Sequence, residues 1–137
     1  MLSQMSVQDP VSVVKSMFSR FASGGAPAAA ALLHEDVVWL PHDRPDREFR
    51  SRDAFLARFR QLAAAGTRIE AVGHAFEDHG DCVVVVGRVR VLSAQGHYDI
   101  PMCWQVDVAD GLVTRVTAER HVEEAREDCG PDASRAA

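Results

Sequence analysis

The chain has 137 residues, a net charge of −5 and 47% hydrophobic residues. This length suits one domain with one core, and the balance of apolar and charged residues is typical of a folded globular protein. The acidic balance disfavours a nucleic-acid partner, because phosphate contacts need clustered Lys and Arg. No apolar run approaches the roughly 18 residues that span a bilayer. We therefore expect neither a nucleic-acid nor a membrane partner.

The cysteines and histidines show no spacing typical of a metal site. Cys82, Cys103 and Cys129 include no CxxC pair, a pattern that predicts reduced thiols rather than a disulfide framework. The six histidines form no HxH or HExxH motif, and no glycine-rich phosphate loop is present. We expect no metal and no cofactor. The first residues lack a basic stretch followed by an apolar one, so we expect no secretory signal and a cytoplasmic protein.

Helices are predicted in the first half of the chain. Asp9 as N-cap and Pro10 at the first helical position begin a helix that ends at residues 23–25. A second, short helix is expected over 27–33 and a third over about 51–65. The first helix has an apolar stripe with the spacing of one buried face: Val14, Met17, Phe18 and Phe21.

Strands are predicted mainly in the second half. One strand at 37–40 follows a turn and precedes a polar loop that reaches residue 52. The hydrophobic period then changes to two over four segments: 68–77, 82–92, 97–108 and 112–122. Residues 123–137 have little to bury and are expected to be a tail of frayed helix or disordered chain. This order predicts one α+β domain over 1–137, with a core at about 9–122 and an antiparallel sheet packed on about three N-terminal helices.

The turns predict how the strands pair. The connection at 93–96 sets Val85 opposite Trp104, and a three-residue hairpin at 109–111 sets Trp104 opposite Val116. This register predicts an inner, helix-facing row of apolar side chains: Val85, Val89, Ile100, Met102, Trp104 and Val116.

The opposite face combines charge with apolar area. Arg90, Asp99 and His121 are predicted side by side there, near Arg88. On an exposed face they would form cross-strand ion pairs worth about 0.2–1 kcal/mol, whereas on an inward face they would be an alternative active site. Apolar residues between these charges favour a homodimer through this outer face: Val84, Val86, Pro101, Cys103 and Val113.

The order of elements and four segments of sequence resemble a known family. The segments are "LLHEDVVWLP", "RDAFLARF", "GDCVVVVGRVRV" and "YDIPMCWQVDVADGLVTRV". Together they resemble the SnoaL-like branch of the nuclear transport factor 2-like superfamily over about residues 9–122. The resemblance implies a cone-shaped α+β roll, in which a curved sheet wraps around the helices and leaves a mostly apolar pocket. Members include polyketide cyclases, ketosteroid isomerases, limonene-type epoxide hydrolases and small dimers with no known reaction.

The catalytic acids of the isomerases have no counterpart in this sequence. The resemblance places their base, at the end of the first strand, on Leu40 or Pro41. Their protonated acid falls on Cys103 or Trp104. None of these side chains can do that chemistry.

The hydrolase and cyclase patterns are also incomplete. The Arg-x-Asp pair of the epoxide hydrolases corresponds to Arg88 and Arg90, and their second Asp to Ala118. The Asp of the SnoaL-like cyclases falls close to His121. Of these groups only an arginine remains.

The implied pocket has predicted walls without a carboxylate, histidine or metal-ligand set. Such a cavity favours an uncharged, flat, apolar small molecule. The tryptophans can serve both the core and the pocket, because the two share walls in this fold. The predicted walls are Phe18, Trp39, Phe55, Phe59, Met102, Trp104 and Val106.

Polar candidates lie at the expected mouth of the pocket. His42 or Tyr98 could act as acid or base, and Arg120 could steer a carbonyl or anionic group. For His42 with Asp43, however, the charged loop favours a solvated turn at this mouth over catalysis. Two functions stay open: a proton-transfer isomerase or cyclase acting on an apolar cyclic carbonyl compound, or a non-catalytic carrier or sensor dimer that uses the same pocket.

Overall fold

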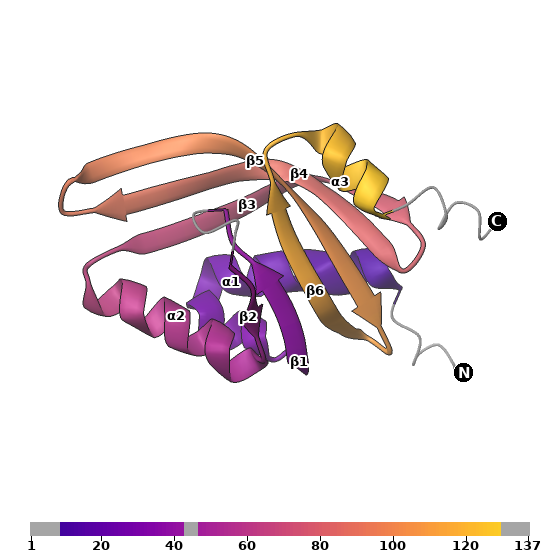
Figure 1. Cartoon of the computed structure of the whole chain (residues 1–137), viewed down its shortest axis with the longest axis horizontal. Helices are drawn as coiled ribbons and strands as arrows, with labels where there is room; N and C mark the ends of the chain where they lie inside the picture. The colour runs from indigo at the N-terminus through magenta and orange to yellow at the C-terminus, as the bar shows by residue number, and fades with distance from the viewer. Residues whose placement is uncertain (1–8, 43–46, 130–137) are drawn as a thin grey trace.

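The computed structural model describes residues 9–42 and 47–129. The six strands form one sheet in the order β2-β1-β6-β5-β4-β3. The sheet curves over α1 and α2 on one side, and α3 lies on its other side (Figure 1). This arrangement confirms the predicted α+β cone. The elements are α1 Pro10–Ala30, β1 Leu33–Leu40, β2 Phe49–Arg50, α2 Arg52–Ala64, β3 Arg68–His79, β4 Cys82–Ser93, β5 Gly96–Ala109, β6 Leu112–Glu119 and α3 Val122–Cys129.

Helix α1 begins as its sequence predicts. The Asp9 Oδ1 atom accepts a hydrogen bond of 2.8 Å from the backbone N–H of Ser12, and Pro10 occupies the first turn. The helix breaks at Gly25, whose φ of 75° and ψ of −165° are not helical, so α1 consists of the two predicted segments. None of the helices in the described ranges is long and apolar enough to cross a membrane.

Strand β1 differs from its prediction in length and direction. It begins at Leu33, in the residues expected to end a helix, and a bulge separates Leu33 from Val38 in its pairing with β6. β1 runs parallel to β6, so the sheet is mixed rather than antiparallel throughout. The intervening α2 and four strands set this direction, whereas the hairpin turns fix only neighbouring strands. The two-residue strand β2 pairs Phe49 with Trp39, inside the predicted loop.

The β4–β5 register is confirmed, with Val85 opposite Trp104 and Val89 opposite Ile100. The predicted β5–β6 register is wrong by two residues, because Trp104 pairs with Ala118 instead of Val116.

The cause of this shift lies at the end of the hairpin. Asp110 and Gly111 form a two-residue turn with φ values of 53° and 79°, and a bulge follows between Asp107 and Val108. A shift of two residues leaves every side chain on its predicted face.

The inner face packs on the helices as predicted. Its core cluster includes Val13, Val14, Met17 and Phe18 of α1. The predicted inward residues Val85, Val89, Met102, Trp104 and Val116 are buried in that cluster, and Ile100 packs against it.

Of the two expectations for the tail, frayed helix or disorder, the structure shows a helix, α3, over residues 122–129, and residues 130–137 lie outside the described residues. This helix is joined to the sheet by a disulfide between Cys129 and Cys82 and by two hydrogen bonds of 2.9 and 2.6 Å from Arg126 to the Glu77 carboxylate. The prediction of three reduced cysteines therefore holds for Cys103 alone, which is free and buried. The spacing of Cys82 and Cys129 gave no signal, because only the folding of α3 onto the sheet brings them together.

Helix α3 also covers the apolar area on which the predicted dimer depended. Val84 and Cys103 are buried in the cluster beneath α3, and Val86 packs against this cluster. Val113 belongs to the inner core. Of that set only Pro101 is exposed.

Candidate functional site

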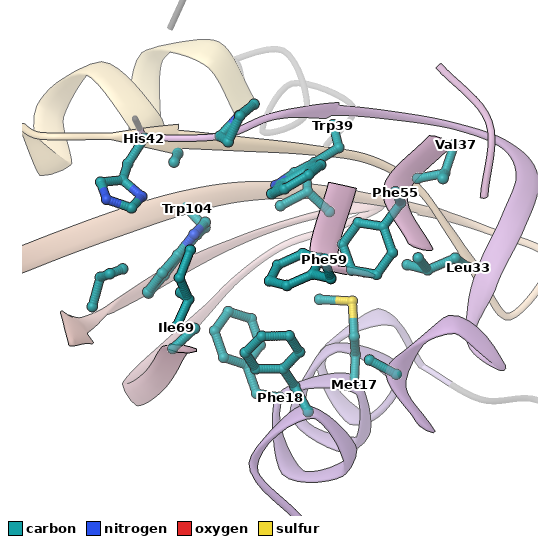
Figure 2. Close-up of a pocket in the computed structure, with 17 residues that line it drawn as sticks. Met17, Phe18, Leu33, Val37, Trp39, His42, Phe55, Phe59, Ile69 and Trp104 are labelled. Atoms are coloured by element: carbon teal, nitrogen blue, oxygen red, sulfur yellow. The ribbon is translucent and has the colours of Figure 1, made fainter. Parts of the chain in front are cut away.

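A cavity of about 80 Å³ lies between α1, α2 and the inner face of the sheet. Figure 2 shows aromatic and aliphatic side chains that surround it from both helices and from the strands. The lining residues are Met17, Phe18, Phe21, Ala29, Leu33, Val37, Trp39, Pro41, His42, Phe55, Phe59, Ile69, Ala71, Val89, Trp104, Val116 and Ala118.

Trp39 forms the centre of an aromatic cluster on one side of the cavity. Its ring stacks on Phe59 at 5.2 Å between centroids and meets the edge of Phe55 at 5.0 Å. Phe49 of β2 packs on Trp39 at 5.3 Å. Trp39 is 8% exposed and also lines the cavity. It is therefore both a core residue and a wall.

Trp104 of β5 forms another part of the wall. Phe18 of α1 meets it edge-to-face, with 5.0 Å between the ring centroids. The chain contains two tryptophans, and both line the cavity. Intrinsic fluorescence therefore reports directly on what the cavity contains.

Most of the predicted wall residues lie at the cavity, and two do not. Phe18, Trp39, Phe55, Phe59 and Trp104 line it. The remaining two, Met102 and Val106, point to the inner face but are fully buried in the packed core. The alternation of side chains along a strand shows which face of the sheet each residue is on. It does not show where the helices that cover that face leave a cavity. The helical stripe and the alternation of β3 also contain wall residues that the prediction omitted: Met17, Phe21, Ile69 and Ala71.

His42 lines the cavity itself rather than a distant mouth. Pro41 is buried directly after β1, and Figure 2 shows the His42 imidazole at the end of the cavity. The expectation of walls without a histidine was therefore wrong. Among the lining residues that the structure describes, His42 is the one with an ionisable side chain. Asp43, its sequence neighbour in the predicted turn, lies outside the described residues.

Tyr98 and Arg120 do not line this cavity. Tyr98 is 47% exposed on the β4–β5 hairpin, which extends past α1 in Figure 1. Arg120 is exposed just after the end of β6. The two-residue shift between β5 and β6 removes Arg120 from its predicted position beside Ile100.

The outer row of charges forms ion pairs on an exposed face. The Arg88 Nε atom donates to Asp99 Oδ1 at 2.7 Å, and Arg90 Nε lies 3.6 Å from Asp99 Oδ2. His121 is not opposite Asp99 as predicted, because β6 ends at Glu119. Its carbonyl oxygen instead accepts hydrogen bonds from the first turn of α3. The alternative active site formed by these three residues is therefore not assembled.

Glu119, whose carboxyl group has a strongly raised pKa, lies on the other side of the sheet. Burial and the neighbouring carboxyl of Asp128 raise the pKa of Glu119 to about 8. Burial also raises the pKa of Asp107. Neither residue lines the cavity, so these groups bear on α3 rather than on the cavity.

Comparison with known proteins identifies the family. Residues 14–116 match the SnoaL-like domain family. The chain belongs to this family. The match covers most of the chain, and the cavity of the SnoaL-like domain lies largely within it. Among proteins with curated functions, none matches this chain significantly.

Solved structures share the fold of this SnoaL-like domain. A proposed polyketide cyclase from Xanthomonas campestris pv. campestris is 26% identical, with a TM-score of 0.65 over 82% of this chain and 90% of that one. TerC, crystallised with polyporic acid, is 17% identical, with a TM-score of 0.71 over 88% and 97% of the two chains. An epoxide hydrolase of the LEH-like type from M. tuberculosis is 14% identical, with a TM-score of 0.70 over 93% and 92%.

Proposed function

We propose that this SnoaL-like protein binds a small, flat, mostly apolar molecule in the cavity between α1, α2 and the sheet. The observation that carries the proposal is a wall whose described residues are aromatic and aliphatic apart from one ionisable group, His42. Such a site favours an uncharged ring system, because each polar ligand atom without a partner would lose its hydration. TerC, a structural neighbour, was crystallised with a small organic compound, which supports this use of the fold.

His42 favours a second candidate, proton transfer on an apolar cyclic carbonyl compound. A histidine held against a bound ring could remove a proton from the carbon next to the carbonyl and return it elsewhere on the ring. Within residues 9–42 and 47–129, the other lining side chains offer no carboxylate and no cation to stabilise the developing oxyanion. Binding without chemistry is therefore the function that the geometry supports best, and proton transfer by His42 is the alternative.

Titration with phenylnaphthylamine, a neutral fluorescent ring compound, tests the binding proposal. We expect it to quench the emission of Trp39 and Trp104 with a micromolar Kd, because both indoles line the cavity. Trp104→Phe should reduce the quenching while the protein stays folded by circular dichroism. Unchanged tryptophan emission at saturating probe would refute binding in this cavity.

Single substitutions separate the two candidates. Proton exchange into deuterated water, followed by NMR on a panel of flat cyclic enones, detects proton transfer on any ring that the cavity accepts. If His42 is a base, His42→Asn should slow exchange by about 10²–10⁴-fold. Tyr98→Phe and Arg120→Ala serve as controls, because neither residue lines the cavity. A carrier would catalyse no exchange, and His42→Asn would only change affinity modestly.

We also propose, as in the sequence-based expectation, that two copies associate. The apolar area on the outer sheet face that favours association is smaller than the sequence predicts, because α3 covers Val84 and Cys103. Light scattering at tens of micromolar protein tests this association, and a monomer at that concentration would refute a stable dimer.

A cytoplasmic location stays a proposal. The Cys82–Cys129 disulfide counts against it, because such bonds are rare in reducing compartments.

A further inference from the structure

A large groove adjoins the small cavity. Its volume is about 940 Å³, and it lies between the broken part of α1, one side of α2 and the beginning of β3. Four residues line both spaces: Phe21, Phe59, Ile69 and Ala71. The cavity of about 80 Å³ is much smaller than the roughly 300–1,000 Å³ of typical ligand sites, so a multi-ring compound needs the adjoining space.

A pair of aromatic rings, Phe21 and Phe59, borders both spaces. Phe21 and Phe59 meet edge-to-face with 5.4 Å between centroids, and both side chains are half-buried. The Phe59 ring is held in place because it also stacks on Trp39. Phe21, in contrast, contacts one aromatic ring among the described residues, that of Phe59. Phe21 is therefore the more easily displaced half of the pair.

The break in α1 shapes the groove. Gly25 has a positive φ of 75° there, which only glycine adopts without strain, and Pro27 follows it. Both residues line the groove. The wall next to Phe21 is thus a break between two helical segments rather than continuous helix.

The rim of the groove carries an excess of positive charge. Arg60 is exposed and forms no ion pair with any residue in the described ranges. Arg68 lies 3.2 Å from Glu70, but the same carboxylate also lies 3.7 Å from Arg90. Arg90 also pairs with Asp99 and does not line the groove. The charged residues described along the groove are therefore two arginines, Arg60 and Arg68, and one acid, Glu70.

We propose that the cavity and this groove form one ligand site for a flat apolar ring system that bears an acidic group. The ring would pass between Phe21 and Phe59 into the cavity, and the acidic group would stay in the groove between Arg60 and Arg68. This inference rests on the proposed binding function and adds the charge of the ligand and its route. The aromatic walls recognise the ring, and the guanidinium groups recognise the anion.

Two probes with the same ring system test the charge. Anilinonaphthalene sulfonate carries an anion, and phenylnaphthylamine lacks it. Arg60→Ala and Arg68→Ala should each weaken the sulfonate by about three-fold and leave the neutral probe unchanged, as expected for solvent-exposed charges. Glu70→Gln should act in the opposite direction and tighten the sulfonate by about two-fold. Arg20→Ala is the matched control, because Arg20 is exposed on α1 but lines neither space.

Stopped-flow fluorescence tests the route. Phe21→Ala should increase the association rate of both probes several-fold, and Phe21→Leu by less, because each opens the partition. Phe76→Leu is the control, since Phe76 contacts Phe18 but lines neither space. Thermal melts verify that each variant is folded.

The outcomes separate this inference from the proposed function. Suppose that phenylnaphthylamine quenches the tryptophans but that Arg60→Ala and Arg68→Ala leave the affinity for anilinonaphthalene sulfonate unchanged. Binding in the cavity then stands, and an acidic ligand is refuted. If the Phe21 variants bind no faster than Phe76→Leu, the route is refuted. If neither probe quenches the tryptophans, the proposed function itself fails. Selective weakening of the sulfonate together with faster binding in Phe21→Ala supports the whole inference.

Discussion

At the scale of single residues, Gly87 and Gly73 show how closely β3 and β4 approach each other. They lie opposite each other in the sheet, next to a bulge in β3 between Gly73 and Ala75. A Cβ atom on Gly87 would collide with the backbone carbonyl of Val72, which cannot move without breaking the pairing. A Cβ atom on Gly73 would meet the Phe76 ring edge at 2.6 Å, and a side chain can give way.

We therefore expect Gly87→Ala to be much more destabilising than Gly73→Ala. The free energy of unfolding should fall by about 3 kcal/mol for Gly87→Ala and by about 1 kcal/mol for Gly73→Ala. Urea denaturation followed by circular dichroism measures both. Equal losses would show that the two strands can separate locally to admit a methyl group at either position.

At the scale of elements, α3 depends on the disulfide that joins it to β4. The bond links residues separated by 47 positions, so it restricts a long loop in the unfolded chain. Loop-closure entropy predicts a stabilisation of about 4 kcal/mol, with strain and residual structure lowering the measured value. We expect the Tm of the Cys82→Ala/Cys129→Ala variant to fall clearly, and Cys103→Ala, which leaves the disulfide intact, to serve as control. Identical Tm values with and without reductant would show that α3 does not need the bond.

The packing of α3 near Glu119 of β6 makes the stability of the fold depend on pH. The pKa of Glu119 is raised to about 8 in the fold from an ordinary value of 4.5, chiefly by burial and then by Asp128. Between these values the folded state keeps a proton that the unfolded state has lost, so the stability contributed by Glu119 decreases as pH rises from about 4.5 to 8. Arg126 lowers the pKa of Glu77, so Glu77 titrates below this window.

Glu119→Gln should reduce that slope, because the amide stays neutral at every pH. The measurement is the free energy of unfolding at pH 5 and pH 8 in the wild type and the variant. Asp107 has a raised pKa as well, so some slope should remain in the variant. A wild-type protein that is more stable at pH 8 than at pH 5 would contradict this assignment.

At the scale of the whole molecule, the cavity is space that the core leaves unfilled. Ala118 lines it from β6, opposite Trp104. Ala118→Val adds two methyl-sized groups to that space, which should stabilise the fold by about 1 kcal/mol. The same substitution should weaken phenylnaphthylamine by about ten-fold, equivalent to 1.4 kcal/mol. Ala75→Val, on an exposed strand position, is the control. A gain in stability without a loss of binding would place the probe elsewhere.

The sequence by itself determined the features that depend on neighbours along the chain. The start of α1 at Asp9 and Pro10 follows from capping, and the register of β4 with β5 follows from a short turn. Alternation then placed Val85 and Trp104 on the inner face. These local rules act over a few residues and predicted the α+β order of elements. The cone and its pocket followed from the family resemblance of the ordered motifs, and five of the seven side chains expected as walls line the cavity.

The tertiary structure decided what depends on segments far apart in the chain. β1 runs parallel to β6, and no turn joins the two strands. The two-residue turn at Asp110 and Gly111 and the bulge after Asp107 together moved β6 by two residues, which separated Arg120 and His121 from their predicted partners. Cys129 meets Cys82 only when α3 folds back onto the sheet. His42 lies at the cavity because the chain after β1 turns inward at the buried Pro41. In each case the position is set by packing between distant elements, and hydrophobic periodicity carries information only about the face of an element and not about what covers it.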